Sequence, residues 1–226
     1  MAKAQGGYFG RGLFDFFREL EENNNREWFT ENKPRYLDHV EQPMLRFIGD
    51  FGERLKKIAP AFVALPTKTG GSLFRIHRDT RFSKDKSPYK TAVAAIFPHR
   101  DHPRNFGLPG FYIHLGPDER LGGGGIHGPQ PPVLAQIRDR IVAKPTAWAA
   151  VRKRTELEGG GLKRAPAGYD PEHRFIEDIK RKDFYAMTRF TEAQVCAPGF
   201  MDTFAEACRD ASALIEFLAA AAGISK

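Results

Sequence analysis

Residues 91–97 read Thr-Ala-Val-Ala-Ala-Ile-Phe, and this apolar run decides the fold that the sequence predicts. Both faces of an extended segment with this composition would be buried, as they are in a central strand of a sheet. Shorter runs at residues 62–65, 73–76, 111–115 and 119–126 also predict strands, separated by clusters of Gly, Pro, His and Asn. Because no helix intervenes between these runs, we expect a mainly antiparallel sheet in the middle of the chain.

Helical periodicity precedes and follows this sheet. Apolar residues recur at steps of three and four from Met44 to Ile58, and Pro60 ends the pattern. A short buried helix is expected near residues 13–20, and a long C-terminal helix over residues 200–222. The predicted fold class is therefore α+β, with a mainly antiparallel sheet in the middle of the chain and helices from both terminal regions packed on it.

Composition limits the class of protein. The chain has 226 residues, of which 41% are hydrophobic and 28% charged, as in an ordinary globular protein, and its nineteen Phe residues suggest a Phe-rich core. We expect a single domain over residues 1–226, with residues 1–10 forming a loose tail. Cys196 and Cys208 are too few and too far apart for a zinc or redox motif, so both are expected to be buried free thiols.

The sequence predicts a cytoplasmic protein without a membrane partner. The first twelve residues lack the apolar run of a signal peptide. The longest apolar stretch, residues 214–224, is interrupted by Glu216 and is too short to span a bilayer. The formal net charge of +7 favours an anionic partner over a cationic one, although a charge of this size does not by itself imply nucleic acid.

The most informative feature is the cationic segment, which we define as Arg75 to Lys90. It holds six Arg or Lys residues against two Asp residues, a formal charge of +4 out of the chain's +7. Three arginines recur at every third residue, and a guanidinium group can bind a phosphate or carboxylate through two parallel hydrogen bonds. The segment therefore predicts an anion-binding site whose ligand is held by four of its cations (Arg75, Arg78, Arg81 and Lys86).

The same segment holds candidate groups for proton transfer. His77 is a candidate because histidine is the side chain most often used for proton transfer, Asp79 can orient a neighbouring arginine or accept a proton, and Tyr89 can donate to a developing negative charge. If the protein is an enzyme, these three are the predicted catalytic residues. His77 could instead only donate a hydrogen bond. The alternative for the whole segment is a solvated face whose Arg–Asp pairs tie a loop down.

The cationic segment resembles the signature of a bacterial protein family, domain-of-unknown-function family 2461. The pattern R-x-H-R-D-T-R-F-S-x-D-K-x-P-Y-K carries the resemblance, together with residues 23–29 (NNNREWF) and 162–170 (LKRAPAGYD). The resemblance extends from about Leu13 to Leu218, and it departs from the family at Arg174, where proline would be expected. It implies a single conserved domain and brings no established activity, cofactor or catalytic residue.

Two of these motifs leave alternatives open. Asn25 is a good N-cap for a helix that carries Phe29, but Asn24 and Arg26 could instead face a ligand. In the second motif, a Gly- and Pro-rich loop can bring backbone N–H groups to a ligand, so two of its cations are added to the predicted ligand-binding residues (Lys163 and Arg164). This basic region is either a second wall of the same anion site or a salt-bridged surface.

Residues 122–125 form a run of four glycines inside a predicted strand. The run lacks the Lys-Ser/Thr of a phosphate-binding P-loop, so a bulge or a close approach of the backbone is the favoured interpretation. A ligand lying against bare backbone is the alternative. No metal site is predicted. His99 and His102 lie with Asp101 in one loop, but the spacing places no further ligand beside this group.

Three functions remain open on the sequence alone. The first, which we favour, is binding of a small phosphate- or carboxylate-bearing ligand at the Arg-rich site, with enzymatic activity undecided. The second is a nucleic-acid-binding or nucleic-acid-processing domain, although no known recognition motif is present. The third is a structural or partner-binding protein in which the cationic segment is a rigid clasp. Substrate, cofactor, reaction and oligomeric state are not determined by the sequence.

Overall fold

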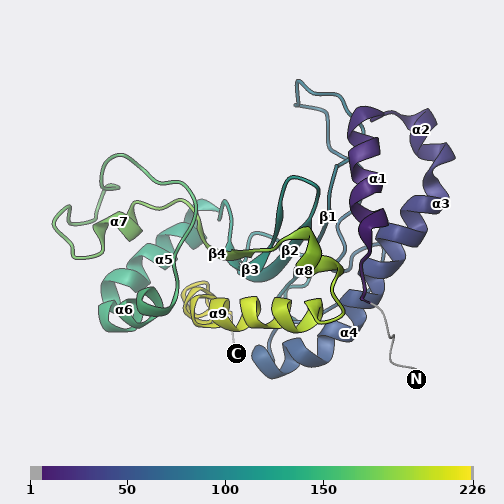
Figure 1. Ribbon diagram of the computed structural model, residues 1–226. Helices are drawn as coiled ribbons and strands as arrows, with labels where there is room; N and C mark the ends of the chain where they lie inside the picture. The colour runs from purple at the N-terminus through teal and green to yellow at the C-terminus, as the bar shows by residue number, and fades with distance from the viewer. Residues whose placement is uncertain (1–6, 225–226) are drawn as a thin grey trace.

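The computed structural model describes residues 7–224 and has an α+β fold, as the sequence predicted (Figure 1). Strands from the middle of the chain form the sheet, and helices come from both ends. The elements are, in chain order, α1 (Arg11–Glu22), α2 (Arg26–Glu31), α3 (Lys33–Tyr36), the π-helical turn η1 (Leu37–Glu41), α4 (Gln42–Ile58), β1 (Val93–Phe97), β2 (Gly110–Leu115), β3 (Arg120–Ile126), α5 (Pro131–Ala143), α6 (Pro145–Arg154), α7 (Ile176–Ile179), β4 (Phe184–Arg189), α8 (Glu192–Cys196) and α9 (Phe200–Ala221).

The sheet has four strands in the order β1-β2-β3-β4, and each strand is antiparallel to its neighbours. Strands β1, β2 and β3 lie where the sequence predicted them, whereas β4 was not predicted. The segment at residues 62–65 forms only a single bridge, between Phe62 and His99. The segment at residues 73–76 likewise has one bridge, from Leu73 to Ala95, so neither is a regular strand.

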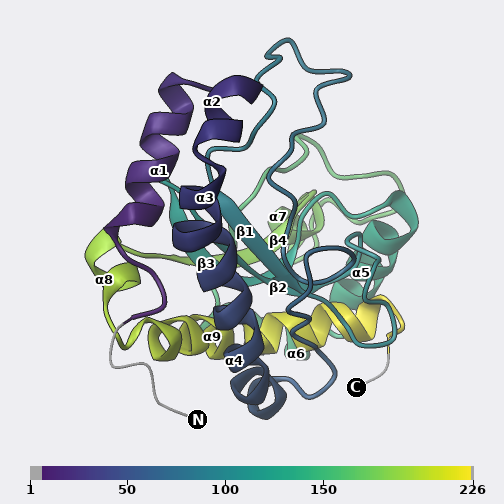
Figure 2. The same cartoon turned by 90° about the vertical axis from the view of Figure 1, so that its right-hand side faces the viewer.

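The cationic segment forms most of a hairpin that extends the sheet beyond β1. We call residues 72–92 the cationic hairpin. Its two arms pair irregularly: the Arg78 N–H donates to the Pro88 carbonyl (2.9 Å), and the Lys90 N–H donates to the Ile76 carbonyl (2.9 Å). The Phe74 N–H donates to the Ala94 carbonyl of β1 (3.0 Å), which joins the first arm to the sheet. Its tip, residues 79–87, projects beyond the helices in Figures 1 and 2. Because β1 has a partner on each side, its apolar composition fits the nearly central position that the sequence predicted.

Helix α9 packs closely on one face of the sheet because β3 carries no side chains where they meet. A Cβ atom on Gly122 would lie 2.6 Å from Cδ2 of Phe204, and one on Gly124 would lie 2.9 Å from Cγ1 of Ile215. Both distances are shorter than any ordinary Cβ contact. Gly125, with φ of +151°, brings β3 close to β4, since a Cβ there would lie 2.2 Å from the Phe184 carbonyl oxygen. The interpretation of the glycine run as a close backbone approach is confirmed.

The core is rich in phenylalanine, as predicted. Buried residues form two clusters, and α9 contributes side chains to both, such as Phe204 to one and Leu218 to the other. In the larger cluster Phe51 contacts Phe97 of β1 and Phe204 of α9, with ring centroids 4.9 and 4.7 Å apart. Helix α4 is therefore joined to both the sheet and the C-terminal helix by aromatic packing.

Residues 7–10 do not form the loose tail that the sequence predicted, and residues 1–6 lie outside the described part of the chain. Phe9 is only 2% exposed and packs against Phe47, with ring centroids 5.3 Å apart. The Tyr8 hydroxyl donates a hydrogen bond to Oδ2 of Asp50 (2.7 Å). The small and polar neighbours of these two aromatic residues concealed the apolar area that they bury.

The two cysteines differ in their surroundings. Both are free thiols, but Cys208 is buried in α9 whereas Cys196 is only half-buried, which corrects the prediction that both are buried. Burial raises the pKa of each thiol, and that of Cys208 rises well above its usual range. Within residues 7–224, none of the helices combines the length and the apolar character needed to cross a lipid bilayer.

A pair of glycine substitutions tests the packing of α9 on β3. Gly122→Ala should lower the free energy of unfolding by about 1–3 kcal/mol, because the new methyl group meets the ring of Phe204. Gly49→Ala is the matched control, since Gly49 is exposed inside α4 and its added Cβ meets only Pro66 at an ordinary 3.7 Å. This control should raise stability by about 0.5–1 kcal/mol. Urea unfolding of the three proteins measures both changes, and equal effects would contradict the packing argument.

Candidate functional site

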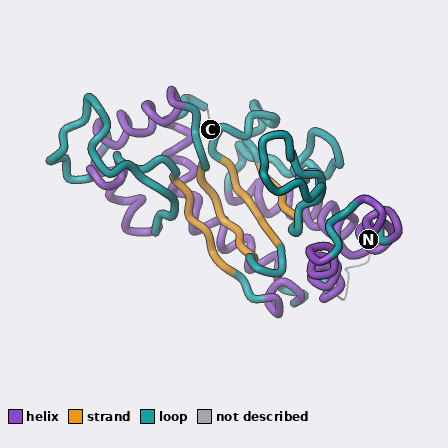
Figure 3. The backbone as a smooth tube through the Cα atoms, turned by 90° about the horizontal axis from the view of Figure 1, so that it is seen from above, coloured by secondary structure: helices purple, strands orange, loops and turns teal. Residues whose placement is uncertain are grey.

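The face of the sheet opposite α9 forms the floor of a groove. Within residues 7–224 no helix lies over this face, as Figure 3 shows in the view from above. The groove has a volume of about 1220 Å³. Its walls come from the cationic hairpin, the β1–β2 loop and the β2–β3 turn, and its floor comes from alternate residues of the four strands (Ala94, Ile96, Tyr112, His114, Leu121, Tyr185, Met187 and Arg189).

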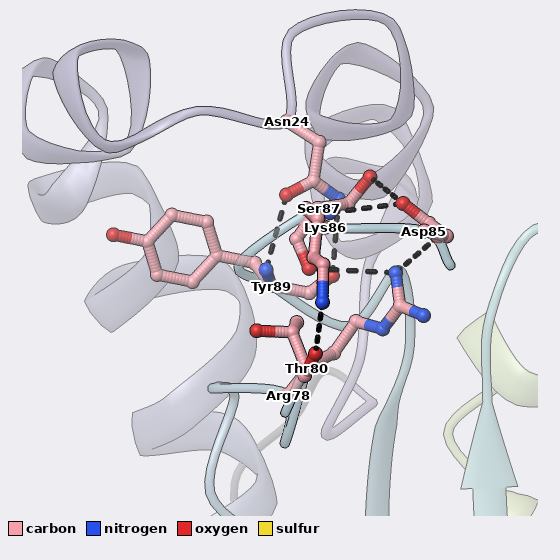
Figure 4. Close-up of polar contacts among 7 residues, drawn as sticks. All are labelled: Asn24, Arg78, Thr80, Asp85, Lys86, Ser87 and Tyr89. Atoms are coloured by element: carbon pink, nitrogen blue, oxygen red, sulfur yellow. Dashed lines mark hydrogen bonds and ion pairs between the residues drawn. The ribbon is translucent and has the colours of Figure 1, made fainter. Parts of the chain in front are cut away.

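At the tip of the hairpin each carboxylate is paired with an arginine. Arg78 forms an ion pair with Asp85, whose Oδ1 also accepts hydrogen bonds from the Ser87 N–H (2.9 Å) and hydroxyl (2.6 Å) (Figure 4). These bonds from Ser87, together with the ion pair to Arg78, hold the pKa of Asp85 well below its usual range. The guanidinium group of Arg78 lines the groove, but its charge is balanced there by that carboxylate.

Arg81 and Lys86 are also engaged within the tip. Arg81 donates to Asp79 through two parallel hydrogen bonds, Nε to Oδ1 (2.9 Å) and Nη2 to Oδ2 (2.7 Å). Lys86 donates from Nζ to the Thr80 carbonyl (2.9 Å) (Figure 4). Neither cation lines the groove. In the described part of the chain, Arg78 is thus the one predicted ligand-binding residue that reaches the groove, and the tip itself has the geometry of a clasp.

The three predicted catalytic residues do not converge on the groove. Hydrogen bonds from Arg81 lower the pKa of Asp79, so this exposed carboxylate stays ionised and paired. The exposed His77 packs its ring against Tyr89, with centroids 5.1 Å apart, and does not line the groove. Tyr89 does line it, but this ring is 5% exposed and stacks on Phe29 with a centroid distance of 4.1 Å. Tyr89 therefore has a packing role in this structure.

Asn24 clamps the backbone of the hairpin at the same place. Its Nδ2 donates to the Tyr89 carbonyl (3.0 Å), and its Oδ1 accepts from the Tyr89 N–H (3.1 Å) (Figure 4). The next residue, Asn25, caps α2 by accepting from the Trp28 N–H, as predicted. The segment at residues 23–29 thus fixes the hairpin to the N-terminal helices, and the amide of Asn24 is already engaged at the groove wall.

Lys163 and Arg164 are not a second wall of the hairpin site, which corrects that interpretation. Both are exposed, in a loop that pairs with the chain before β4 through the Leu162 N–H and the Lys180 carbonyl (2.8 Å). The hairpin extends the opposite edge of the sheet, beyond β1, and the two basic regions lie apart in Figure 1. The salt-bridged alternative fits Lys180, whose Nζ lies 2.7 Å from Oε1 of Glu177.

Lys90 and Arg75, at the base of the hairpin, carry charges that no described carboxylate neutralises. The half-buried Lys90 lines the groove and donates from Nζ to the Arg75 carbonyl (3.0 Å). Among residues 7–224, neither cation forms an ion pair within 4.0 Å of a carboxylate. Burial lowers the pKa of Lys90, and the nearby charge of Arg75 lowers it further. The groove wall is therefore positively charged at this place.

A histidine and a tyrosine on the floor form a hydrogen-bonded pair close to this charge. The Tyr112 hydroxyl lies 3.2 Å from Nδ1 of His114. Burial lowers the pKa of His114; the charge of Glu119 raises it in part, and that of Lys90 lowers it. At neutral pH the imidazole is therefore neutral and can accept a proton. This pair was not predicted from the sequence, although alternation in β2 places both residues on the face opposite the buried Phe111 and Ile113.

At the β4 end of the groove, by contrast, the cationic side chain is paired with a carboxylate. Arg189 forms two hydrogen bonds with Glu158, from Nη1 (3.0 Å) and Nη2 (2.6 Å). Nδ1 of His127 lies 3.0 Å from Oδ1 of Asp183. Within the described residues, no group of three or more His, Cys, Asp or Glu side chains is arranged to hold a metal ion. The arrangement favours an anion at the Lys90 end, beside an acid–base pair.

Comparison with known proteins identifies the family of the chain. Residues 12–217 match the family described as "Conserved hypothetical protein (DUF2461)", the family that the sequence motifs resemble. No curated protein and no solved structure matches the chain.

Substitution of Asn24 tests the clamp on the hairpin. Asn24→Ala removes both hydrogen bonds to Tyr89 and should lower the free energy of unfolding by roughly 1–3 kcal/mol. Asn24→Asp keeps the acceptor but sets a carboxylate against the Tyr89 carbonyl, so it should not restore stability. Hydrogen exchange at the Tyr89 amide should accelerate in both variants. Asn25→Ala, which removes only the cap of α2, is the control that should leave this amide more protected.

Stability at mildly acidic pH tests the environment of His114. Its folded-state pKa lies below the unfolded value of about 6.5, so the unfolded state binds more protons as the pH falls through that value. As the pH falls from about 7 to about 5, through the unfolded pKa, the wild type should therefore lose stability relative to His114→Gln. Denaturant unfolding across this pH range measures the difference. Parallel stability curves for the two proteins would contradict the assigned direction.

Proposed function

The chain belongs to the DUF2461 family, and we propose that it binds a small ligand carrying a phosphate or carboxylate group in the groove at Lys90. One observation carries this proposal: a half-buried ammonium group lines the groove without a carboxylate partner among the described residues. The sequence placed the ligand at the arginines of the hairpin tip, but these already form ion pairs with Asp79 and Asp85. The proposed site is therefore at the base of the hairpin.

Electrostatics supports an anion at this position. Removing a cation from water is unfavourable unless it is paired, and the lowered pKa of Lys90 reflects that desolvation together with the charge of Arg75. A bound phosphate or carboxylate would offset both effects through a charge-assisted hydrogen bond, which is shorter and stronger than a neutral one. Within the described residues no carboxylate supplies this bond within 4.0 Å, and Asp85 in the groove wall is engaged with Arg78 and Ser87.

The same geometry supports proton transfer next to the bound anion. In this proposal the neutral imidazole of His114 is the general base, and the hydroxyl of Tyr112 is a hydrogen-bond donor to charge that develops on the ligand. An anion near Lys90 would reduce the positive potential at His114 and so raise its pKa towards neutrality. The protein would then be an enzyme whose reaction includes a proton transfer at the ligand.

The nucleic-acid alternative rests on a different part of the hairpin. Phe82 at the tip is 95% exposed, and the guanidinium of Arg81 lies 5.8 Å from its ring centroid. Exposed aromatic rings beside cations are typical of proteins that stack on single-stranded bases. However, the two arginines that precede Phe82 form ion pairs with Asp79 and Asp85, and neither Phe82 nor Arg81 lines the groove. The groove is therefore the better-supported site.

A lysine pair tests the anion site. Wild-type protein should bind inorganic phosphate in the groove, and Lys90→Met should weaken this binding about tenfold or more, because it removes the charge-assisted hydrogen bond. Lys84→Met removes the same charge from the exposed tip and should change the affinity less than about twofold, as expected for a screened surface charge. Isothermal titration calorimetry with phosphate measures the affinities, and thermal unfolding confirms that each variant is folded.

Two outcomes would remove the proposal. One is equal loss of phosphate binding in the two lysine variants, which would indicate only a general charge effect. The other is a wild type that binds neither phosphate nor citrate. A short oligonucleotide measured in parallel at two salt concentrations separates the alternative, since binding through phosphate contacts weakens steeply as salt rises.

A further inference from the structure

The groove is larger than an isolated anion requires. Its volume is about 1220 Å³, whereas pockets that enclose whole organic ligands typically measure about 300–1,000 Å³. The anion site at Lys90 lies at one side of this space, in the wall formed by the hairpin. The other residues that line the groove next to Lys90 therefore indicate what kind of molecule carries the anionic group.

Three aromatic rings line the groove next to Lys90. The ring of Phe74 contacts that of Phe106 edge-to-face, with centroids 5.4 Å apart and an interplanar angle of 60°. It also lies near the ring of Tyr112, with centroids 6.3 Å apart and an interplanar angle of 62°. The three rings come from separate segments, namely the hairpin, the β1–β2 loop and β2. We call this group the aromatic wall.

Phe106 is left exposed by the rest of the protein. This side chain is 48% exposed, and apart from its contact with Phe74 no other aromatic contact is found for it among the described residues. A large apolar side chain at the mouth of a groove, with polar groups close by, is typical of a ligand-binding surface rather than of a packed core. Edge-to-face rings also leave room for a further planar ring against their faces.

The aromatic wall and the anion site are adjacent. Nζ of Lys90 lies 5.4 Å from the ring centroid of Phe74, the ring that contacts both Phe106 and Tyr112. A ligand whose anionic group binds Lys90 therefore places its next atoms against this wall. An apolar aliphatic chain would fill part of the space, but a flat ring makes the stacked and edge contacts that these orientations offer.

We propose that the ligand of this groove is an aromatic anion: a planar ring that bears a phosphate or carboxylate group. The inference rests on the proposed anion site at Lys90 and names the class of compound that the site takes. The ring packs against Phe74, Phe106 and Tyr112, while the anionic group receives the charge-assisted hydrogen bond from Lys90. His114, hydrogen-bonded to Tyr112, then lies beside the ring and its substituent.

A series of phosphates tests the inference by calorimetry. Phenyl phosphate should bind at least about fivefold more tightly than inorganic phosphate, because the ring adds aromatic contacts and buries apolar area. Cyclohexyl phosphate, which matches the size of the ring without being planar, should fall between the two. A nucleoside monophosphate and a short oligonucleotide are titrated in the same way. Their affinities show whether the groove takes a single phosphorylated ring system or a nucleic-acid strand.

Two phenylalanine variants locate the contact. Phe106→Ala should reduce the affinity for phenyl phosphate to near that for inorganic phosphate, while inorganic phosphate binds as in the wild type. Phe82→Ala is the matched control, since this ring is more exposed than Phe106 and lies at the hairpin tip outside the groove. It should change neither affinity. Both side chains are exposed, so neither variant removes core packing.

The results separate this inference from the proposed function. If inorganic phosphate binds through Lys90 but phenyl phosphate binds no more tightly, the aromatic-anion inference is wrong and the anion site stands. The inference is also wrong if Phe106→Ala still binds phenyl phosphate more tightly than inorganic phosphate, or if Phe82→Ala loses this difference in affinity equally. In either case the ring does not bind at the aromatic wall. If no phosphate binds, the proposed function and the inference fall together.

Discussion

The structure depends on a strand that has no side chains where a helix crosses it. Gly122 and Gly124 let α9 approach β3 so closely that even a methyl group at either position would collide with Phe204 or Ile215. This contact commits the long C-terminal helix to one face of the sheet, where it contributes to both clusters of buried residues. Within residues 7–224 no helix covers the other face, and the floor of the groove lies there (Figure 3).

The distribution of charge in the hairpin follows from chain geometry. At the tip, Asp79 lies two residues before Arg81, and Asp85 lies across the turn from Arg78, so short local contacts neutralise both arginines. At the base, the two arms pair through their backbones, and Arg75 and Lys90 have no carboxylate within ion-pairing distance in the described chain. The arginines of the tip are thus engaged within the hairpin, whereas Lys90 at its base lines the groove without a carboxylate partner in the described chain.

Part of the fold and little of the site could be predicted from residue patterns. Helical periodicity and the apolar run at residues 91–97 are local properties, so α4, α9 and three strands lie where they were expected. Strand β4 was missed because its short sequence follows a charged stretch and lacks a clear alternation. Tyr89 looked like a free phenol, but its role depends on Phe29 and Asn24, which are about sixty residues away in sequence.

The sequence by itself determined the α+β class, the antiparallel middle, the glycine-based close approach and the concentration of positive charge in residues 75–90. These features depend on periodicity, on the lack of a Cβ atom and on a count of charges, all of which are local. Only the tertiary structure decided which charges are neutralised and which side chains share the groove. Ion pairing and burial depend on contacts between segments that are remote in sequence. Such contacts bring Lys90 of the hairpin close to Tyr112 and His114 of β2.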